Sequence, residues 1–175
     1  MKKLILSVAA LGLLVLPAYA TQGIRENAKY EIARAKKINL SIPKRGGIVR
    51  FKSPFTVEET IARFREEVGK RPLNIIAEVN HQANAESVNL ELRPTFLFIF
   101  GNPRVGTPLM QCNQTTGIDL PQKALIWEDE NGEVWLGYNS PKFLNKRHRL
   151  RGCADEALET VGNALRGLAE ATVTP

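Results

Sequence analysis

The side chains best suited to acid–base chemistry in this sequence are its two histidines, His81 and His148, together with Asp119. An imidazole takes up or releases a proton near neutral pH, and Lys123 would stabilise negative charge developing beside it. The sequence contains no nucleophile-elbow, zinc-protease or paired-carboxylate motif that would complete such a site. An uncharacterised enzyme with His/Asp chemistry is therefore one hypothesis, but the sequence favours a protein that is not an enzyme.

Metal or haem binding is a second hypothesis. His81, Met110 and His148 are side chains that copper and haem iron accept as ligands, and Cys112 could add a thiolate. A methionine in a short helix, however, more often fills core space, and an isolated histidine more often makes a structural hydrogen bond. The sequence therefore identifies no cofactor.

The hypothesis that these residues favour is a pocket, near His81, Lys123 and His148, for a small ligand with an anionic group. The lysine and the imidazoles would donate hydrogen bonds to that group. Lys123 could instead extend along the apolar sheet face to the end of its strand, or pair with Asp119. The candidate ligand-binding residues are His81, Arg104, Thr107, Met110, Asp119, Lys123, Tyr138 and His148.

The glycine-containing segment Gly101–Thr107 has the spacing of a phosphate loop, but Thr107 and Pro108 stand where Lys and Ser or Thr would follow. We expect Thr107 to be an N-cap and Pro108 to open a short helix through Cys112. The exposed amide groups of that helix could receive a small anion, with Arg104 nearby.

The chain contains two cysteines, Cys112 and Cys153, whose spacing excludes a redox C-x-x-C pair. A disulfide between them would close a loop of about 40 residues and stabilise the fold by roughly 4 kcal/mol. Two buried thiols, or one thiolate bound to a metal, are the alternatives.

Residues 1–20 have the pattern of a secretory signal peptide. Lys2 and Lys3 precede the apolar run 4–16, and Ala18-Tyr19-Ala20 is a cleavage site. That run is shorter than the ~20 residues of a membrane-spanning helix, so we expect no membrane span once the signal is removed. We expect a bacterial protein that is periplasmic or secreted. Loss of Lys2 and Lys3 would lower the net charge from +6 to +4, and this mild surplus argues against nucleic-acid binding.

Helices are predicted from caps and apolar spacing. Thr56 and Glu59 form a capping box before a helix that Gly69 and Pro72 end. Ser140 and Pro141 open a short helix, on which Leu144 and His148 share a face. Residues 21–46 are expected to form a basic arm or helix. A closing amphipathic helix is predicted with its apolar face at Leu158, Val161, Leu165 and Leu168.

Strands are predicted from alternation. Strand 73–81 would place Leu73, Ile75, Ala77, Val79 and His81 on one face, and strand 95–100 is apolar on both faces, as if covered on both sides by helices or a second subunit. Asn131-Gly132 predicts a two-residue hairpin turn in which Trp127 faces Leu136 and Leu125 faces Tyr138. Lys123 would then share the apolar face of Leu125, Trp127, Val134, Leu136 and Tyr138.

From about Gly47 to Leu150 the chain resembles domain-of-unknown-function family 302. The resemblance rests on motifs in a fixed order: Glu91-Leu92-Arg93-Pro94-Thr95, Phe100-Gly101-Asn102-Pro103, Gly106-Thr107-Pro108-Leu109-Met110-Gln111, Asp119-Leu120-Pro121, Lys123, Trp127-Glu128-Asp129, Gly132, Trp135, Tyr138-Asn139, Pro141 and Arg147-His148. Cys112, Cys153 and Arg149 depart from the family pattern, so a disulfide would be particular to this chain.

The resemblance implies an α+β fold, with a small mostly antiparallel sheet and flanking helices in a single domain that often forms a homodimer. It implies no established activity. The histidines, Met110, Asp119 and Lys123 match family positions and are candidates for a shared site. The expected organisation is a signal peptide (1–20), a basic arm (21–46), the family-like domain (47–150) and a C-terminal amphipathic helix (151–175).

Overall fold

The computed structural model describes residues 40–41 and 47–175. The predicted signal peptide and all of the predicted arm except residues 40–41 lie outside the described residues. In chain order the elements are β1 (Leu40–Ser41), β2 (Ile48–Ser53), α2 (Val57–Gly69), β3 (Asn74–Asn80), α3 (His81–Glu86), β4 (Thr95–Gly101), α4 (Pro103–Cys112), the 3-10 helix η1 (Gln114–Ile118), β5 (Gln122–Glu128), β6 (Val134–Asn139), α5 (Pro141–His148) and α6 (Asp155–Val173).

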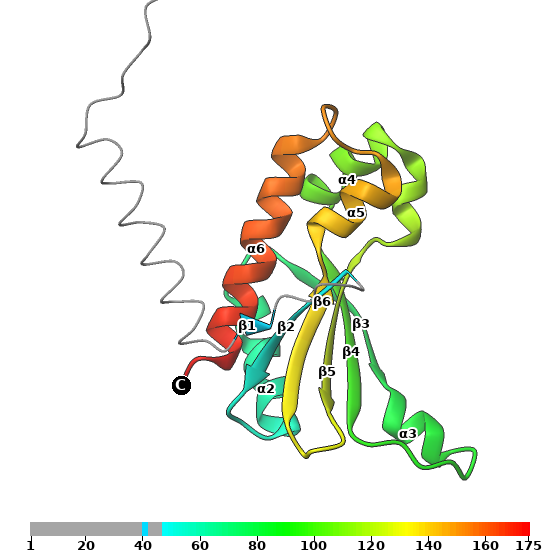
Figure 1. The fold of residues 1–175 in the computed structure, drawn as a ribbon, viewed down its shortest axis with the longest axis vertical. Coiled ribbons are helices and arrows are strands. Elements are labelled where there is room, and N and C mark those ends of the chain that lie inside the picture. The colour runs from blue at the N-terminus through cyan, green and yellow to red at the C-terminus, as the bar shows by residue number, and fades with distance from the viewer. Residues whose placement is uncertain (1–39, 42–46) are drawn as a thin grey trace, which may run out of the picture. The chain divides into compact units, whose positions relative to one another are not determined.

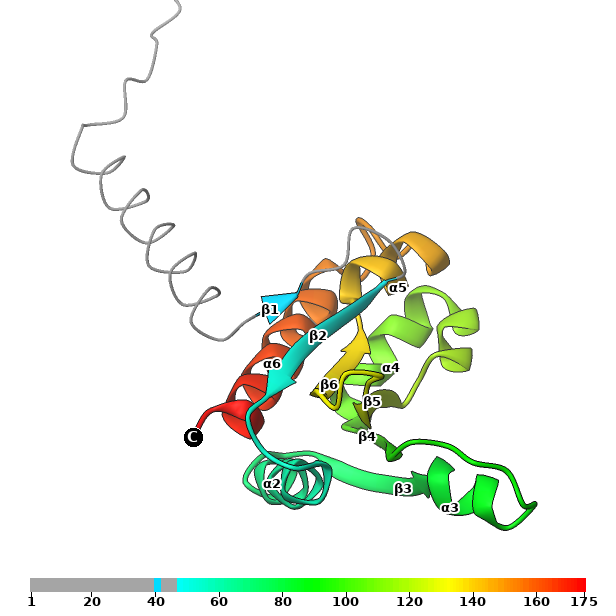
Figure 2. The same ribbon diagram turned by 60° about the horizontal axis from the view of Figure 1, so that its bottom comes forward.

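The strands form one six-stranded sheet in the order β1-β2-β6-β5-β4-β3, and every neighbouring pair is antiparallel. Helices α4 and α5 lie beyond one end of the strands and α3 lies beyond the other, while α6 runs alongside β2 (Figures 1 and 2). The predicted α+β fold with an antiparallel sheet and flanking helices is confirmed.

The core lies between one face of the sheet and helices α2 and α6. Phe98 and Phe100 of β4 pack against Phe64 of α2, with ring centroids 4.7 and 5.4 Å apart. Leu165 and Leu168 cover the same core from α6. Helices α2 and α6 therefore cover the side of the sheet that carries Phe98 and Phe100, which we call the core face of the sheet. The opposite face of β4, with Leu97 and Ile99, is only half-buried.

Two helix starts follow the predicted signals because capping depends on a few adjacent residues. Thr56 accepts a hydrogen bond from the backbone N–H of Glu59 (3.1 Å), and the Glu59 carboxylate accepts one from the N–H of Thr56 (3.0 Å). Ser140 caps α5, whose first residue is Pro141.

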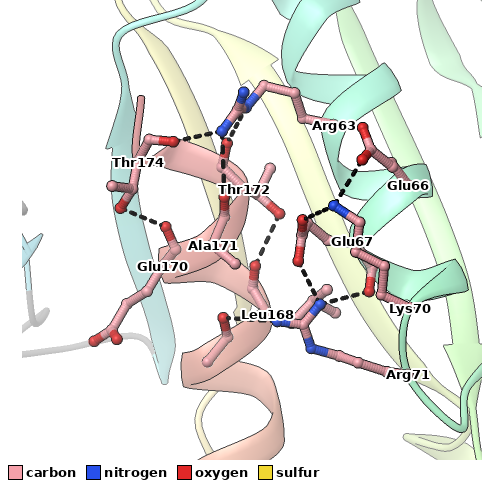
Figure 3. Close-up of polar contacts among 11 residues, drawn as sticks. Arg63, Glu66, Glu67, Lys70, Arg71, Leu168, Glu170, Ala171, Thr172 and Thr174 are labelled. Atoms are coloured by element: carbon pink, nitrogen blue, oxygen red, sulfur yellow. Dashed lines mark hydrogen bonds and ion pairs between the residues drawn. The ribbon is translucent and has the colours of Figure 1, made fainter.

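Helix α2 also holds the C-terminal end of α6 (Figure 3). Arg63 donates hydrogen bonds from Nε to the carbonyl of Thr172 (2.7 Å) and from its terminal nitrogen to the carbonyls of Ala171 and Thr174. These carbonyls have no partner further along the helix, and the guanidinium opposes the negative end of the helix dipole. The arginine therefore docks the last turn of α6 onto α2.

The predicted hairpin register is wrong by one residue. The N–H of Gly132 donates to the carbonyl of Asp129 (3.1 Å), and Gly132 has φ +74°, so the loop has three residues rather than two. Trp127 consequently pairs with Trp135, not Leu136. Since side chains alternate along a strand, one residue of slip exchanges the two faces. Lys123, Leu125 and Trp127 therefore lie opposite the core face that carries Val134, Leu136 and Tyr138.

Strand β3 differs from its predicted alternation because it contains a bulge. Ile75 pairs with Phe100, but Ala77 pairs with Ile99, so Ile75 and Ala77 face opposite sides of the sheet. The strand ends at Asn80, whose side chain accepts a hydrogen bond from the N–H of Ala83 (3.0 Å) and caps α3. His81 is therefore the first residue of a short helix and does not extend the apolar strand face.

Candidate functional site

Three of the candidate residues meet where α5 packs on η1. The His148 ring lies between Asp119, with Nε2 2.6 Å from Oδ2, and Thr115, with Nδ1 3.0 Å from Oγ1. Lys123 donates from Nζ to the backbone carbonyls of Asp119 and Pro121, both at 3.2 Å. The lysine therefore extends to the end of its strand, and its ammonium bonds carbonyls rather than the Asp119 carboxylate.

The side chains of Asn113, Thr115, Asp119, Arg147 and His148, which we call the His148 cluster, are hydrogen-bonded mainly to one another. Arg147 lies 3.3 Å from the second carboxylate oxygen of Asp119. Thr115 Oγ1 also donates to the side-chain oxygen of Asn113 (2.8 Å), and the Asn113 amide donates to the carbonyl of His148 (2.9 Å). The His148 side chain is only 4% exposed. A substrate in solvent has little access to this imidazole, and the cluster's evident effect is to join η1 to the end of α5.

His81 is not brought to this cluster. Strand β3 places Asn74 beside Gly101 and Asn80 beside Phe96, so its two ends are about 20 Å apart at ~3.3 Å per residue. His81 follows the Asn80 end, and Figure 1 shows α3 and α5 at opposite ends of the sheet. The proposed metal ligands His81 and His148 therefore do not converge. Within residues 40–41 and 47–175, no three His, Cys, Asp or Glu side chains are grouped to hold a metal ion.

Tyr138 is also separate from the cluster. It lies on the core face of β6, 6% exposed, and its ring stacks on Phe51 at 6.0 Å. Burial raises the pKa of its phenol to about 12, because the phenolate would lose hydration in the core. A neutral packed phenol is the resulting state at physiological pH.

The N-terminus of α4 differs from the sequence expectation. The helix begins at Pro103 after the N-cap Asn102, so Thr107 and Pro108 are interior residues and Arg104 is exposed in the first turn. The N–H of Arg104 donates to the Asn102 side chain (2.8 Å), and the N–H groups of Val105 and Gly106 donate to the Asn102 carbonyl (3.0 Å each). These amides are therefore already bonded and offer no anion site. The Asn102-Pro103 pair is itself a cap-plus-proline signal that directly follows β4.

A cavity of about 350 Å³ lies between α4 and α6, at the end of the sheet where β3 and β5 begin. We call it the α4–α6 cavity. Its lining is mainly apolar, and no charged side chain lines it among the residues that the structure describes. The lining residues are Leu73, Asn74, Ile76, Phe100, Gly101, Asn102, Pro103, Val105, Gly106, Thr107, Met110, Leu120, Pro121, Gln122, Val161, Ala164 and Leu165. Of the candidate residues, Thr107 and Met110 are among them.

Gln122 is the functional candidate that the sequence reasoning missed. It is the first residue of β5, on the same face as Ala124 and Ile126, and it is 8% exposed. Its Nε2 is buried and has no hydrogen-bond partner among the described residues. Gln122 alternates with the apolar residues Ala124 and Ile126, and this pattern could have identified it as buried. The wrong hairpin register instead assigned the buried face to Lys123 and Leu125.

The two cysteines are paired as a disulfide, with Cα atoms 5.8 Å apart. Cys112 ends α4 and Cys153 precedes α6 by two residues. The bond therefore connects the two helices that flank the α4–α6 cavity.

Comparison with known proteins identifies relatives of this domain. The family model described as "Domain of unknown function DUF302" matches residues 49–168. A solved structure described as an uncharacterized conserved DUF302 protein from Bacillus stearothermophilus has the same fold, with a TM-score of 0.66 at 16% identity over 73% of this chain and 99% of that chain.

Two curated relatives are named "Fluoride-specific ion channel FluC 1", from Brucella suis biovar 1 (strain 1330) and Brucella abortus biovar 1 (strain 9-941). Each is 44% identical over 115 residues, which are 66% of this chain but only 45% and 43% of those proteins. The chain thus spans less than half of their length. Residues 40–41 and 47–175 include no helix that is long and apolar enough to cross a membrane.

Proposed function

Since the chain belongs to the DUF302 family, we propose that it is an exported member that binds a small ligand in the α4–α6 cavity. The observation that carries this proposal is an apolar cavity of about 350 Å³ walled by two helices and the ends of three strands. Burial of apolar ligand surface there supplies the binding energy. Because the exposed Thr107 and Ala164 are among the lining residues, the cavity has a solvent-facing side through which a ligand could enter.

The size of the cavity limits its ligand. A dry apolar cavity of about 150 Å³ accommodates benzene, and the α4–α6 cavity has somewhat more than twice that volume. A ligand of two or three rings, or an alkyl chain of similar volume, would fit in it. The His148 cluster is a poorer binding site because its polar groups already satisfy one another.

Ligand binding can be tested with N-phenyl-1-naphthylamine, an uncharged dye whose fluorescence rises in apolar surroundings. The wild-type protein, recovered from the periplasm, is expected to give a saturable increase. Ala164→Trp places an indole in the cavity and should abolish it, whereas Asn163→Trp, at the neighbouring exposed position outside the lining, should leave it unchanged. Equal dye binding by the two variants would refute the cavity as the site.

We also propose that the protein is a homodimer, as the family resemblance implies. The sheet face opposite the core carries half-buried apolar side chains from adjacent central strands, including Leu97, Ile99, Leu125 and Trp127. A second copy of the same face would remove them from water. Leu125→Glu should yield monomers by light scattering, while Thr160→Glu, exposed on α6, should not. A monomeric wild type would contradict this proposal.

We do not propose fluoride conduction for this chain. The Brucella proteins bear the name of a fluoride channel, but this chain covers fewer than half of their residues. The 115 matched residues are shared sequence, and the activity of the whole protein does not follow from them.

A further inference from the structure

We infer that the α4–α6 cavity selects an uncharged, mainly apolar ligand that carries a hydrogen-bond acceptor, and that Gln122 is the residue that recognises this acceptor. This inference rests on the proposed ligand-binding function. The expected ligand is a ring system or short chain that bears a ketone, ester or amide carbonyl.

Gln122 has a buried hydrogen-bonding group that has no partner within the part of the chain that the structure describes. Gln122 is one of the residues that line the cavity, and its Nε2 is buried without a partner among the described residues. Buried donors are nearly always paired in native proteins, because an unpaired one loses its hydration without compensation. The amide can turn about its last side-chain bond, which exchanges Nε2 and Oε1 and can present the donor to a ligand.

The other polar groups around the cavity are already engaged or exposed. The side-chain oxygen of Asn102 accepts a hydrogen bond from the N–H of Arg104, and its amide nitrogen donates one to the carbonyl of Pro72 (2.8 Å). The first N–H groups of α4 donate to Asn102. Asn74 and Thr107 are exposed to solvent. Gln122 is therefore the buried side chain in this lining that has a hydrogen bond to offer.

The absence of charge in the lining selects against ions. No Lys, Arg or His is among the described residues that line the cavity. A carboxylate or phosphate would lose its hydration on entry and gain only one neutral amide donor. The anionic ligand expected from the sequence would have to bind outside this cavity, whereas a neutral carbonyl satisfies Gln122 at little desolvation cost.

The test compares two naphthalenes of nearly equal shape. 2-Acetylnaphthalene carries a carbonyl and 2-ethylnaphthalene a methylene at the same position. The affinities of both are measured for the wild type and for Gln122→Leu, by displacement of N-phenyl-1-naphthylamine. The double comparison cancels the difference in hydrophobicity between the probes. The acetyl-to-ethyl affinity ratio is expected to be about tenfold higher in the wild type than in the variant.

Three results would overturn the inference. A ratio that is the same in the two proteins would show that Gln122 does not recognise the carbonyl, although binding of both probes would leave the cavity function standing. Tighter binding of 2-naphthoate than of 2-acetylnaphthalene would refute the uncharged ligand class. Failure of the wild type to bind any of the naphthalenes or the dye would refute the proposed function as well.

Discussion

Replacing Gln122 with leucine should stabilise the ligand-free protein. The wild-type side chain is 8% exposed and its Nε2 has no partner among the described residues, so the folded state carries the cost of a desolvated donor. Such a group costs about 1–3 kcal/mol. Leucine has no hydrogen-bonding group to satisfy and packs beside Ala124 and Ile126, and the adjoining cavity accommodates its branched end.

We expect the free energy of unfolding to rise by about 1 kcal/mol, since repacking will recover only part of that cost. The melting temperature should rise by about 3 °C for a domain of this size. Urea denaturation followed by the fluorescence of Trp127 and Trp135 measures the first quantity, on protein extracted to remove bound small molecules. Gln111→Leu, on an exposed position of α4, is the matched control and should change stability by less than about 0.5 kcal/mol.

The same variant should respond less to ligand. Saturating 2-acetylnaphthalene stabilises the folded state in proportion to the logarithm of its affinity, so the wild type should gain more from it than Gln122→Leu. If Gln122→Leu is instead less stable than the wild type by about 1 kcal/mol or more, the amide already has a partner in solution. In that case Gln122 would be a structural residue, and the inference that it recognises a ligand carbonyl would be refuted.

Three further predictions concern residues that do not line the cavity. Arg63→Met should lower the free energy of unfolding by about 2 kcal/mol and speed hydrogen exchange in the last turn of α6, because it removes the donors on those carbonyls; unchanged exchange would contradict this role. The double variant Cys112→Ser/Cys153→Ser should lose about 4 kcal/mol, and reduction of the wild type should reproduce that loss; equal stability of oxidised and reduced protein would count against it. Because burial raises the pKa of Tyr138 from 10 to about 12 in the folded state, the stability that the neutral phenol contributes is fully present below pH 10 and is lost as pH rises through 12, by up to about 3 kcal/mol. Denaturation between pH 9 and pH 12 should therefore show a steeper loss for the wild type than for Tyr138→Phe, and parallel curves would refute this assignment.

Local signals predicted much of this fold. The capping box at Thr56 and the Ser140-Pro141 pair depend on hydrogen bonds within a few residues, so they hold in any surrounding structure. The apolar face of α6 was predicted from helical spacing and is buried in the core. Asp119, Lys123 and His148, three of the candidate residues, do lie close together, but their hydrogen bonds make a structural cluster and His81 is not part of it.

The sheet face on which each strand residue lies was less predictable, because a single inserted residue reverses the assignment for the rest of the strand. One additional residue in the loop before Glu133 exchanged the two faces of β5, and a bulge after Ile75 did the same within β3. Neither event changes the alternation of apolar residues along a strand, so the pattern alone could not reveal them. Lys123 was assigned to the core face for this reason, and Gln122 was overlooked.

The sequence by itself determined the family, the α+β class and the position of most helices and strands, because these depend on short-range hydrogen bonds and on periodic burial. Only the tertiary structure decided which candidate residues meet. The α4–α6 cavity combines residues as distant in sequence as Leu73, Gln122 and Leu165. Their proximity depends on the packing of α4 and α6 against the ends of three strands, and no local pattern specifies that packing. The same packing separates His81 from His148 and buries Gln122 beside the space that we assign to a ligand.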